Sequence, residues 1–331
     1  MHDVEIKCID RTWILSRVRS FLCFFLFFRT ICTIFAHSMK KSMVLAICAM
    51  AVMIGCKTGN TRQQGDGVSA GGDSTAVETT ASEAGEHIGW DSLKTDTVSF
   101  EKQEGVYTLS LSADYPVAGG DSLVKAVREY INDYMGGAYE GPLDDGQAMI
   151  RRDGEILYGT FLEMCGDADE DAGELFLYKS VNKGYETATC VTFLAMTSHY
   201  TGGLHGISYE TGQTFSKATG RQFGYDMMRD TESPAFKRLI KEGLKKYFIG
   251  DKEKKDMSDE DLLEELVSYD GSADELPLPD SEPYMTEKGV TFIYQPYEIS
   301  YYAAGKPEFT IPYDVVMPYL KESAKELFLD K

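Results

Sequence analysis

The stretch from Gly184 to Phe223 constrains the fold most, because it has the pattern of paired β-strands around glycine-rich bends. β-branched and aromatic residues crowd "YETATCVTFLAMTSHY", a Gly-Gly pair follows, and "ISYETGQTF" then alternates between polar and apolar residues. Runs of this kind, bounded by turn residues, are typical of strands joined by tight turns. A second turn is expected at Thr219-Gly220. The sequence therefore predicts a long strand–turn–strand ribbon at the centre of the chain.

Helical patterns flank this ribbon on both sides. Apolar residues recur at helical spacing in "SLVKAVREYINDYM", which Gly136-Gly137 ends, and residues 146–164 favour a second helix. Beyond the ribbon, Ser233 and Ser258 are expected to cap two more helices, and a last helix is expected to begin near Asp314. An alternating strand is expected before the first helix, and short strands before the last one. Helices and strands mix without regular alternation, so the prediction is an α+β fold with antiparallel-rich sheets.

The segment "MKKSMVLAICAMAVMIGC", ending at Cys56, has the order of a bacterial export signal. Two lysines precede an apolar run that is shorter than the roughly 20 residues of a spanning helix. The small residue before Cys56 resembles the lipobox of bacterial lipoproteins, in which the cysteine is diacylated. We therefore expect Cys56 to be the lipidation site and the protein to be anchored to the bacterial cell envelope. The alternative is an ordinary signal followed by an unmodified cysteine.

The composition divides the chain into five parts. An apolar stretch before Met39 is interrupted by Arg29, and Met39 itself begins a complete signal, so the first part is expected to be spurious or unstructured; the alternative is a genuine but unusual anchor. The segment after Cys56 is rich in Gly, Ser and Thr and poor in large apolar residues, as in flexible tethers. The predicted boundaries are an extension at 1–38, a signal peptide at 39–55, a tether at 56–86, an N-terminal α+β module at 87–220 and a C-terminal module at 221–331.

Charge and cysteine content narrow the possible partners. Seven of the 33 Lys/Arg and three of the 53 Asp/Glu residues precede Cys56, so the exported chain would carry a net charge of about −24 instead of −20. Such acidity argues against nucleic-acid binding and favours basic partners, although it also simply aids solubility. After Cys56 only Cys165 and Cys190 remain. In an oxidising compartment they could form a disulfide, or they could be two buried thiols.

The histidines of "SHYTGGLHG" are the strongest candidates for chemistry. His199 and His205 are not accompanied by a zinc-type spacing, and Glu210 and Asp226 could complete a metal site only through tertiary folding. The sequence also has no GxSxG elbow. A structural turn explains more, with glycines at the bend and His205 bonded to a backbone group. We expect a turn formed by Gly202, Gly203, His205 and Gly206, and no catalytic residue, metal or cofactor.

Two stretches resemble a known family. "YTGGLHG" with "KATG", and above all "GVTFIYQPYEISYYAAGKPEFTIPY", are similar to the extracellular domain of the anti-sigma-V factor RsiV and related bacterial lipoproteins. The resemblance covers roughly residues 95–325 and implies an N-terminal α+β module packed against a C-terminal RsiV-like module. The best understood relative binds lysozyme. We expect no cytoplasmic sigma-binding segment joined to a full spanning helix, and the folded part is not long enough to include a deacetylase domain as well, so neither activity is carried over from the family.

These observations predict a non-enzymatic ligand-binding or sensing lipoprotein. The resemblance points to a basic protein of the lysozyme type, or to a peptidoglycan fragment, as the partner. The alternatives are a glycan or cell-wall hydrolase with paired carboxylates and a purely structural envelope protein. The acidic run "DADEDAGE" is expected to be a solvated loop. A last group, expected to serve mainly as core or framework, comprises Tyr294, Tyr297, Tyr301 and Tyr302.

Overall fold

The computed structural model describes residues 92–166, 173–250, 256–325 and 327, which belong to one compact unit, Gly85–Lys331. The predicted extension, signal peptide and tether, with the lipidation site Cys56, lie outside the described residues, as does most of the acidic run. Among the helices that are described, none is long and apolar enough to cross a membrane.

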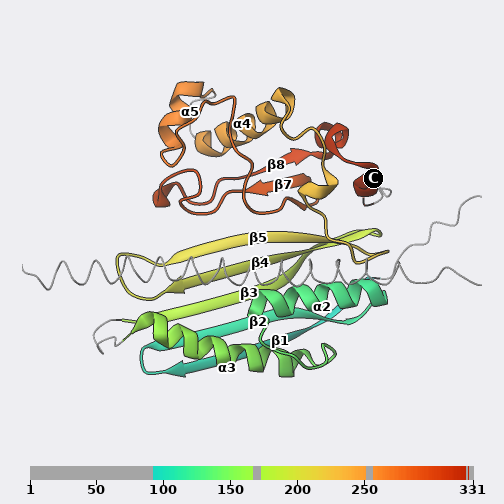
Figure 1. Ribbon diagram of the computed structural model, residues 1–331, viewed down its shortest axis with the longest axis vertical. Helices are drawn as coiled ribbons and strands as arrows, with labels where there is room; N and C mark the ends of the chain where they lie inside the picture. Colours follow the sequence, from blue (N-terminus) through green and yellow to red (C-terminus); the bar gives the residue numbers. More distant parts are fainter. Residues whose placement is uncertain (1–91, 167–172, 251–255, 326, 328–331) are drawn as a thin grey trace, which may run out of the picture. The chain divides into compact units, whose positions relative to one another are not determined.

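A five-stranded mixed sheet forms the first layer (Figure 1). Its strands lie side by side in chain order: β1 (Lys94–Glu104), β2 (Tyr107–Ala118), β3 (Leu175–Glu186), β4 (Cys190–Tyr200) and β5 (Ile207–Ser216). Only the β2–β3 pair is parallel; the others are antiparallel. The α+β prediction is confirmed, and the predicted ribbon is the β4–β5 pair. The sequence pattern did not reveal β1 or most of β3, because charged and neutral polar residues interrupt their alternation.

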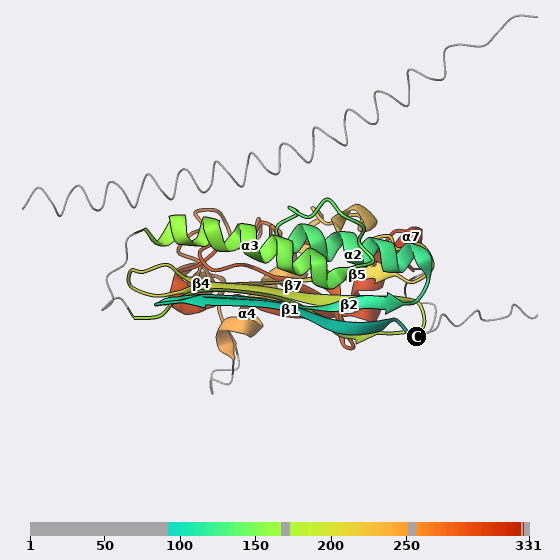
Figure 2. The ribbon, with the colours of Figure 1, turned by 90° about the horizontal axis from the view of Figure 1, so that it is seen from below.

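Helices α2 (Asp121–Met135) and α3 (Gly146–Cys165) cover one face of this sheet (Figure 2). The apolar stripe predicted for α2 is confirmed, since Leu123, Val127 and Ile131 are fully buried against the sheet. The start of α3 is set by Asp145, whose side chain accepts a hydrogen bond from the Ala148 backbone N–H at 2.8 Å. The two helices form the connection that makes β2 and β3 parallel.

The second module combines a small antiparallel sheet, in the order β6-β7-β8, with one 16-residue helix and several shorter helical segments. Ser233 and Ser258 cap its first two helices as predicted. The single helix expected from Asp314 is wrong: Pro318 interrupts it, and two short helices flank a 3₁₀ turn. The elements are η2 (Tyr225–Met227), α4 (Pro234–Ile249), α5 (Asp259–Glu265), β6 (Tyr284–Met285), β7 (Gly289–Ile293), η3 (Tyr302–Ala304), β8 (Glu308–Pro312), α6 (Tyr313–Val316), η4 (Met317–Tyr319) and α7 (Glu322–Lys325).

Threonine hydroxyls join the two modules. Thr192 on β4 and Thr214 on β5 lie 2.7 Å apart, and between them they bind both backbone groups of Met285, at 2.9 Å to its carbonyl and 2.8 Å from its N–H. Beside this junction, the Tyr284 ring lies directly over Gly212, where a Cβ would come within 2.3 Å of it. Because these contacts are buried, they fix the second module against β5.

Cys165 and Cys190 are not bonded to each other. Cys165 ends α3 and packs beside the hydrophobic cluster of the five-stranded sheet, where burial raises the pKa of its thiol to about 11. Cys190 is buried in the cluster of the second module, with its Sγ 3.3 Å from the Thr187 hydroxyl. The two thiols therefore belong to different cores, as in the non-disulfide alternative that the sequence left open.

Candidate ligand-binding site

The β4–β5 turn and the loop after β7 meet at one end of the sheet. His205 in the turn stacks on Tyr302, with ring centroids 3.7 Å apart and planes at 18°. The hydroxyl of Tyr297 lies 3.2 Å from His205 Nε2. These contacts join the two stretches that are nearly 100 residues apart and that carry the family resemblance. We call Leu204, His205, Tyr297 and Tyr302 the tip cluster.

The turn itself is held by hydrogen bonds and by glycine conformations. Gly202 and Gly203 have φ values of +98° and +107°, which side chains rarely tolerate. Tyr200 donates to the Gly203 carbonyl at 2.9 Å. His205 Nδ1 lies 2.9 Å from the Gly206 carbonyl, which can only accept, so Nδ1 carries the proton. His205 Nε2 lies 3.2 Å from the Tyr297 hydroxyl, so the ring contacts both a backbone group of the turn and the loop after β7.

The tip cluster presents apolar surface to solvent. Leu204 is fully exposed at the end of the turn, and Tyr297 is 50% exposed. Tyr302 is half-buried and its hydroxyl donates to the Gly206 carbonyl at 2.8 Å. Tyr297 adopts a φ of +69°, an uncommon conformation for a bulky residue that the surrounding contacts must maintain. Leu204 and Tyr297 are therefore exposed on a turn and a loop that hydrogen bonds and ring stacking hold together.

The four C-terminal tyrosines have different roles. Tyr294 is fully buried and donates to the Pro277 carbonyl at 2.5 Å, as expected for a core residue. Tyr301 is 41% exposed and donates to Glu265 at 2.9 Å. Tyr297 and Tyr302 belong to the tip cluster, so the core part of the expectation holds for Tyr294, whereas the framework contacts of Tyr297, Tyr301 and Tyr302 lie at the surface. The sequence did not reveal this difference in burial, because the four tyrosines lie close together in one motif.

A second set of contacts ties the loop to the edge of β5. The Gln295 side chain accepts from the Glu210 N–H at 3.1 Å and donates to the Glu210 carbonyl at 2.7 Å, imitating a neighbouring strand. The Glu210 carboxylate pairs with Lys306. These bonds fix the position of the loop relative to the turn, as the residues of a preorganised binding surface require.

The residues that the sequence offered as possible metal ligands do not come together in one site. His199 stacks near Tyr209, with centroids 6.3 Å apart, and burial lowers its pKa. Asp226 binds Arg221 at 2.7 Å rather than a histidine. Across the ranges that the structure describes, no three His, Cys, Asp or Glu side chains are grouped as metal ligands.

Two carboxylates elsewhere have a raised pKa: Glu298, which is partly buried, and Glu308, whose residue as a whole is exposed although its carboxyl group is partly desolvated. Burial raises the pKa of Glu298, whose two oxygens accept from the N–H groups of Gln295 (2.6 Å) and Asp280 (2.7 Å). Burial also raises the pKa of Glu308, which accepts from the Tyr284 hydroxyl at 3.4 Å.

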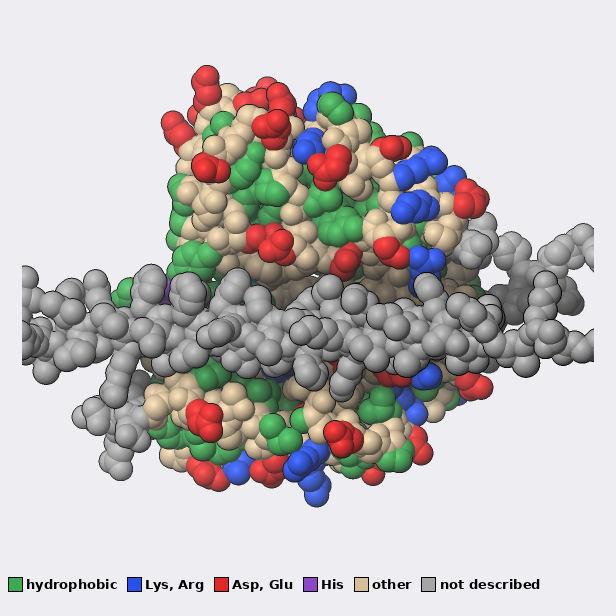
Figure 3. Space-filling model, in the orientation of Figure 1, with side chains coloured by type: hydrophobic (Ala, Val, Ile, Leu, Met, Phe, Trp, Pro, Cys, Tyr) green, Lys and Arg blue, Asp and Glu red, His purple; other side chains and the backbone are tan. Residues whose placement is uncertain are grey.

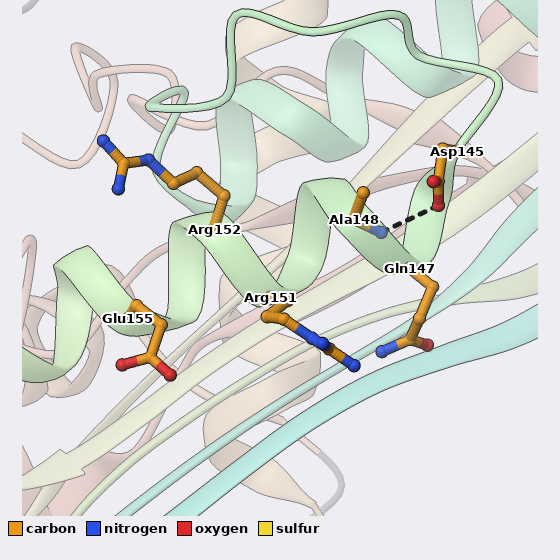
Figure 4. A pocket seen from close by; sticks show the side chains of 6 residues that line it. All are labelled: Asp145, Gln147, Ala148, Arg151, Arg152 and Glu155. Carbon is orange, nitrogen blue, oxygen red and sulfur yellow. Dashed lines mark hydrogen bonds between the residues drawn. The ribbon is translucent and has the colours of Figure 1, made fainter.

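A cavity of about 440 Å³ lies apart from these groups, along α3 (Figure 4). It is lined by Asp145, Gln147, Ala148, Arg151, Arg152 and Glu155.

Comparisons with known proteins give one family match and similar solved structures. Residues 226–314 match the family model described as "Protein of unknown function (DUF3298)", so the chain contains a DUF3298 domain. A solved member of that family from Bacteroides fragilis NCTC 9343 is 20% identical with a TM-score of 0.50, and the match covers 71% of this chain and 98% of that one. A second, from Pseudomonas aeruginosa PAO1, is 16% identical with a TM-score of 0.48, covering 72% and 97%. No curated protein matches the chain.

Proposed function

We propose that the protein is an RsiV-like envelope lipoprotein, anchored through Cys56, that binds a ligand with its tip cluster rather than catalysing a reaction. The observation that carries the proposal is the fully exposed Leu204 on a turn braced by His205 and Tyr302. When a partner covers an aliphatic side chain on a flexible loop, the loop becomes ordered and loses conformational entropy. Here the support is already ordered, so less conformational entropy is lost when a partner covers it.

The composition of the cluster suits a protein surface. Tyrosine combines a rigid apolar ring with a polar tip, and aromatic residues dominate the energy of many interfaces. In the face drawn in Figure 3, acidic side chains are spread over the described surface, which would steer a basic partner toward the molecule. A basic protein of the lysozyme type is therefore the first partner to test, and a peptidoglycan fragment the second.

The test is a calorimetric titration with hen lysozyme at low and at physiological salt. We expect saturable binding at both, weaker at the higher salt because exposed charges are screened beyond about 8 Å. L204D should lower the affinity at least about tenfold, since it places a charge at the centre of the contact. V267D is the matched control, because Val267 is also an exposed aliphatic residue (62%) but lies outside the tip cluster. Absence of saturable binding, or equal losses in the two variants, would overturn the lysozyme assignment.

The hydrolase alternative has weaker support. Glu210 is neutralised by Lys306, and Glu298 is occupied by backbone N–H groups, so neither carboxylate is placed to act on a substrate. Glu308 retains a raised pKa through burial, as a general acid would. Release of soluble fragments from peptidoglycan by the purified chain, abolished in E308Q, would favour catalysis over binding.

A further inference from the structure

The two edge strands of the five-stranded sheet differ in how far other residues cover their backbone groups. On β5, Gln295 binds the backbone of Glu210, and Phe223 N–H donates to the Thr214 carbonyl at 2.8 Å, so its outer edge is covered. Within the described residues β1 pairs with β2 alone, and its eleven residues form the opposite edge. An uncovered edge of this length can pair with another strand.

The direction of the β1 backbone groups follows from the neighbouring ladders. Leu175 N–H donates to the Val106 carbonyl at 2.8 Å, so even-numbered residues of β2 turn their polar groups toward β3 and odd-numbered ones toward β1. Because Glu104 pairs with Tyr107, even-numbered residues of β1 face β2 in turn. The odd-numbered residues from Thr95 to Gln103 therefore point their N–H and C=O groups outward. Gln147 already donates to one of them, the Ser99 carbonyl, at 2.8 Å.

We propose that β1 pairs antiparallel with β1 of a second copy of this chain, around a twofold axis at Ser99. In this register every outward-pointing residue faces another one: Ser99 faces Ser99, Thr97 faces Glu101, and Thr95 faces Gln103. Each such pair can exchange two backbone hydrogen bonds. The two sheets then form one continuous sheet, which removes the open edge.

The charged residues of β1 select this register. On the helix-bearing face, Lys94 lies opposite Glu104 of the second copy, and Asp96 opposite Lys102. A shift of two residues in one direction would set Lys94 against Lys102, and a shift in the other would set Asp96 against Glu104. Charges on an edge strand usually prevent pairing, but here the sequence is complementary to itself in one register. Lys94, Asp96 and Glu104 are exposed. Within one chain, Lys102 Nζ lies 3.4 Å from Glu104 and 3.5 Å from Glu155, so Asp96 of the second copy would join an ion-pair group that already exists.

The neighbouring helix reaches the β1 edge near the proposed axis through Gln147, whose side chain would have to share the Ser99 carbonyl with the second copy. Helix α3 lies above β1 and β2, with Phe100 of β1 under Gly154. A twofold axis normal to the sheet would bring the α3 helices of the two copies side by side on the same face, where packed helices are about 8–10 Å apart. The cavity of about 440 Å³ lies on α3 and includes Gln147, the residue that reaches the β1 edge. The Ser99 carbonyl has two lone pairs, so it can accept from Gln147 and from the second copy together.

Dimerisation would alter how the protein works at the membrane. Each dimer would carry two tip clusters and two tethers, because β1 follows the tether directly. Two linked sites raise the apparent affinity for a repetitive ligand without any new contact. This inference concerns β1 and α3 and does not depend on the ligand of the tip cluster.

Disulfide trapping tests the axis. In the chain from position 56 onward carrying C56S and C165A, S99C should cross-link under mild oxidation, because Cα atoms of a hydrogen-bonded antiparallel pair are about 5.5 Å apart, within disulfide range. T97C is the matched control, since the Cα atoms of the two copies of residue 97 would be about 14 Å apart. T97C combined with E101C should cross-link again. Equal trapping of S99C and T97C would overturn the proposal.

Sedimentation equilibrium tests the register. The parent chain should show a concentration-dependent dimer, and K94E or E104K should each weaken it about tenfold by setting like charges opposite each other. K94E/E104K together should restore the dimer, because the charges are then exchanged rather than opposed. Circular dichroism of each variant checks folding. A parent chain that stays monomeric at 100-fold different concentrations, or a double variant as weak as the single ones, would contradict the pairing.

Discussion

Glu186, at the end of β3, anchors the start of β1 through four hydrogen bonds. One oxygen accepts from the Leu93 N–H and from Lys217, both at 2.7 Å. The other accepts from Ser92 at 3.0 Å and from Lys183 at 3.1 Å. Lys217 is only 3% exposed, so its ammonium group depends on this partner. We predict that E186Q strongly destabilises the protein by leaving a buried charge without its counter-ion.

The pKa of Glu186 sets the magnitude and the pH dependence. Burial alone would raise this pKa, but the hydrogen bonds from Lys217, Leu93, Lys183 and Ser92 outweigh it and hold the pKa at about 2, against a usual value of 4.5. At 1.36 kcal/mol per unit this corresponds to about 3 kcal/mol, which we reduce to about 2–3 kcal/mol because the side chain is 17% exposed. Because the folded pKa is depressed, the stabilisation is present above pH 4.5 and is lost as the pH falls toward 2.

Urea unfolding at pH 7 and pH 3 measures both effects. E186Q should lower the free energy of unfolding by about 2–3 kcal/mol at pH 7 and by clearly less at pH 3. E242Q is the control, because Glu242 is an exposed carboxylate on α4. E186Q/K217M should be more stable than E186Q alone, since it removes the orphaned ammonium as well. A deficit that is the same at the two pH values, or no larger than that of E242Q, would refute the electrostatic explanation.

Two further predictions concern other parts of the fold. Burial lowers the pKa of Lys179 to about 8, so the unfolded chain holds its proton at higher pH than the folded one. Stability should therefore rise between about pH 8 and 10.5, and K179M should abolish that rise in urea titrations; a rise that persists would implicate another group. Ser233 accepts from the Phe236 N–H at 3.2 Å, so S233A should cost about 1 kcal/mol in thermal or urea unfolding. An unchanged midpoint would mean that water replaces the cap.

Local signals allowed much of the fold to be predicted. The helix caps at Ser233 and Ser258 and the apolar stripe of α2 act within a few residues, and each appears where the pattern placed it. Strand β1 was missed because an edge strand buries little, so charged residues replace the alternating apolar pattern. The helix expected from Asp314 failed at Pro318, where the missing N–H and the ring prevent a continuous helix.

For the candidate site, the sequence indicated the parts but not their assembly. The glycines around His205 predicted a turn because positive φ values favour glycine at those positions, and that chemistry is local. The exposure of Leu204 and the stacking of His205 on Tyr302 depend on where the C-terminal loop folds back, nearly 100 residues later. Repeated tyrosines look alike in a sequence, whereas burial separates Tyr294 from Tyr297. Propensities and caps are therefore set by neighbouring residues, while contacts between distant segments, and with them the surface that meets a partner, are decided only when the chain packs.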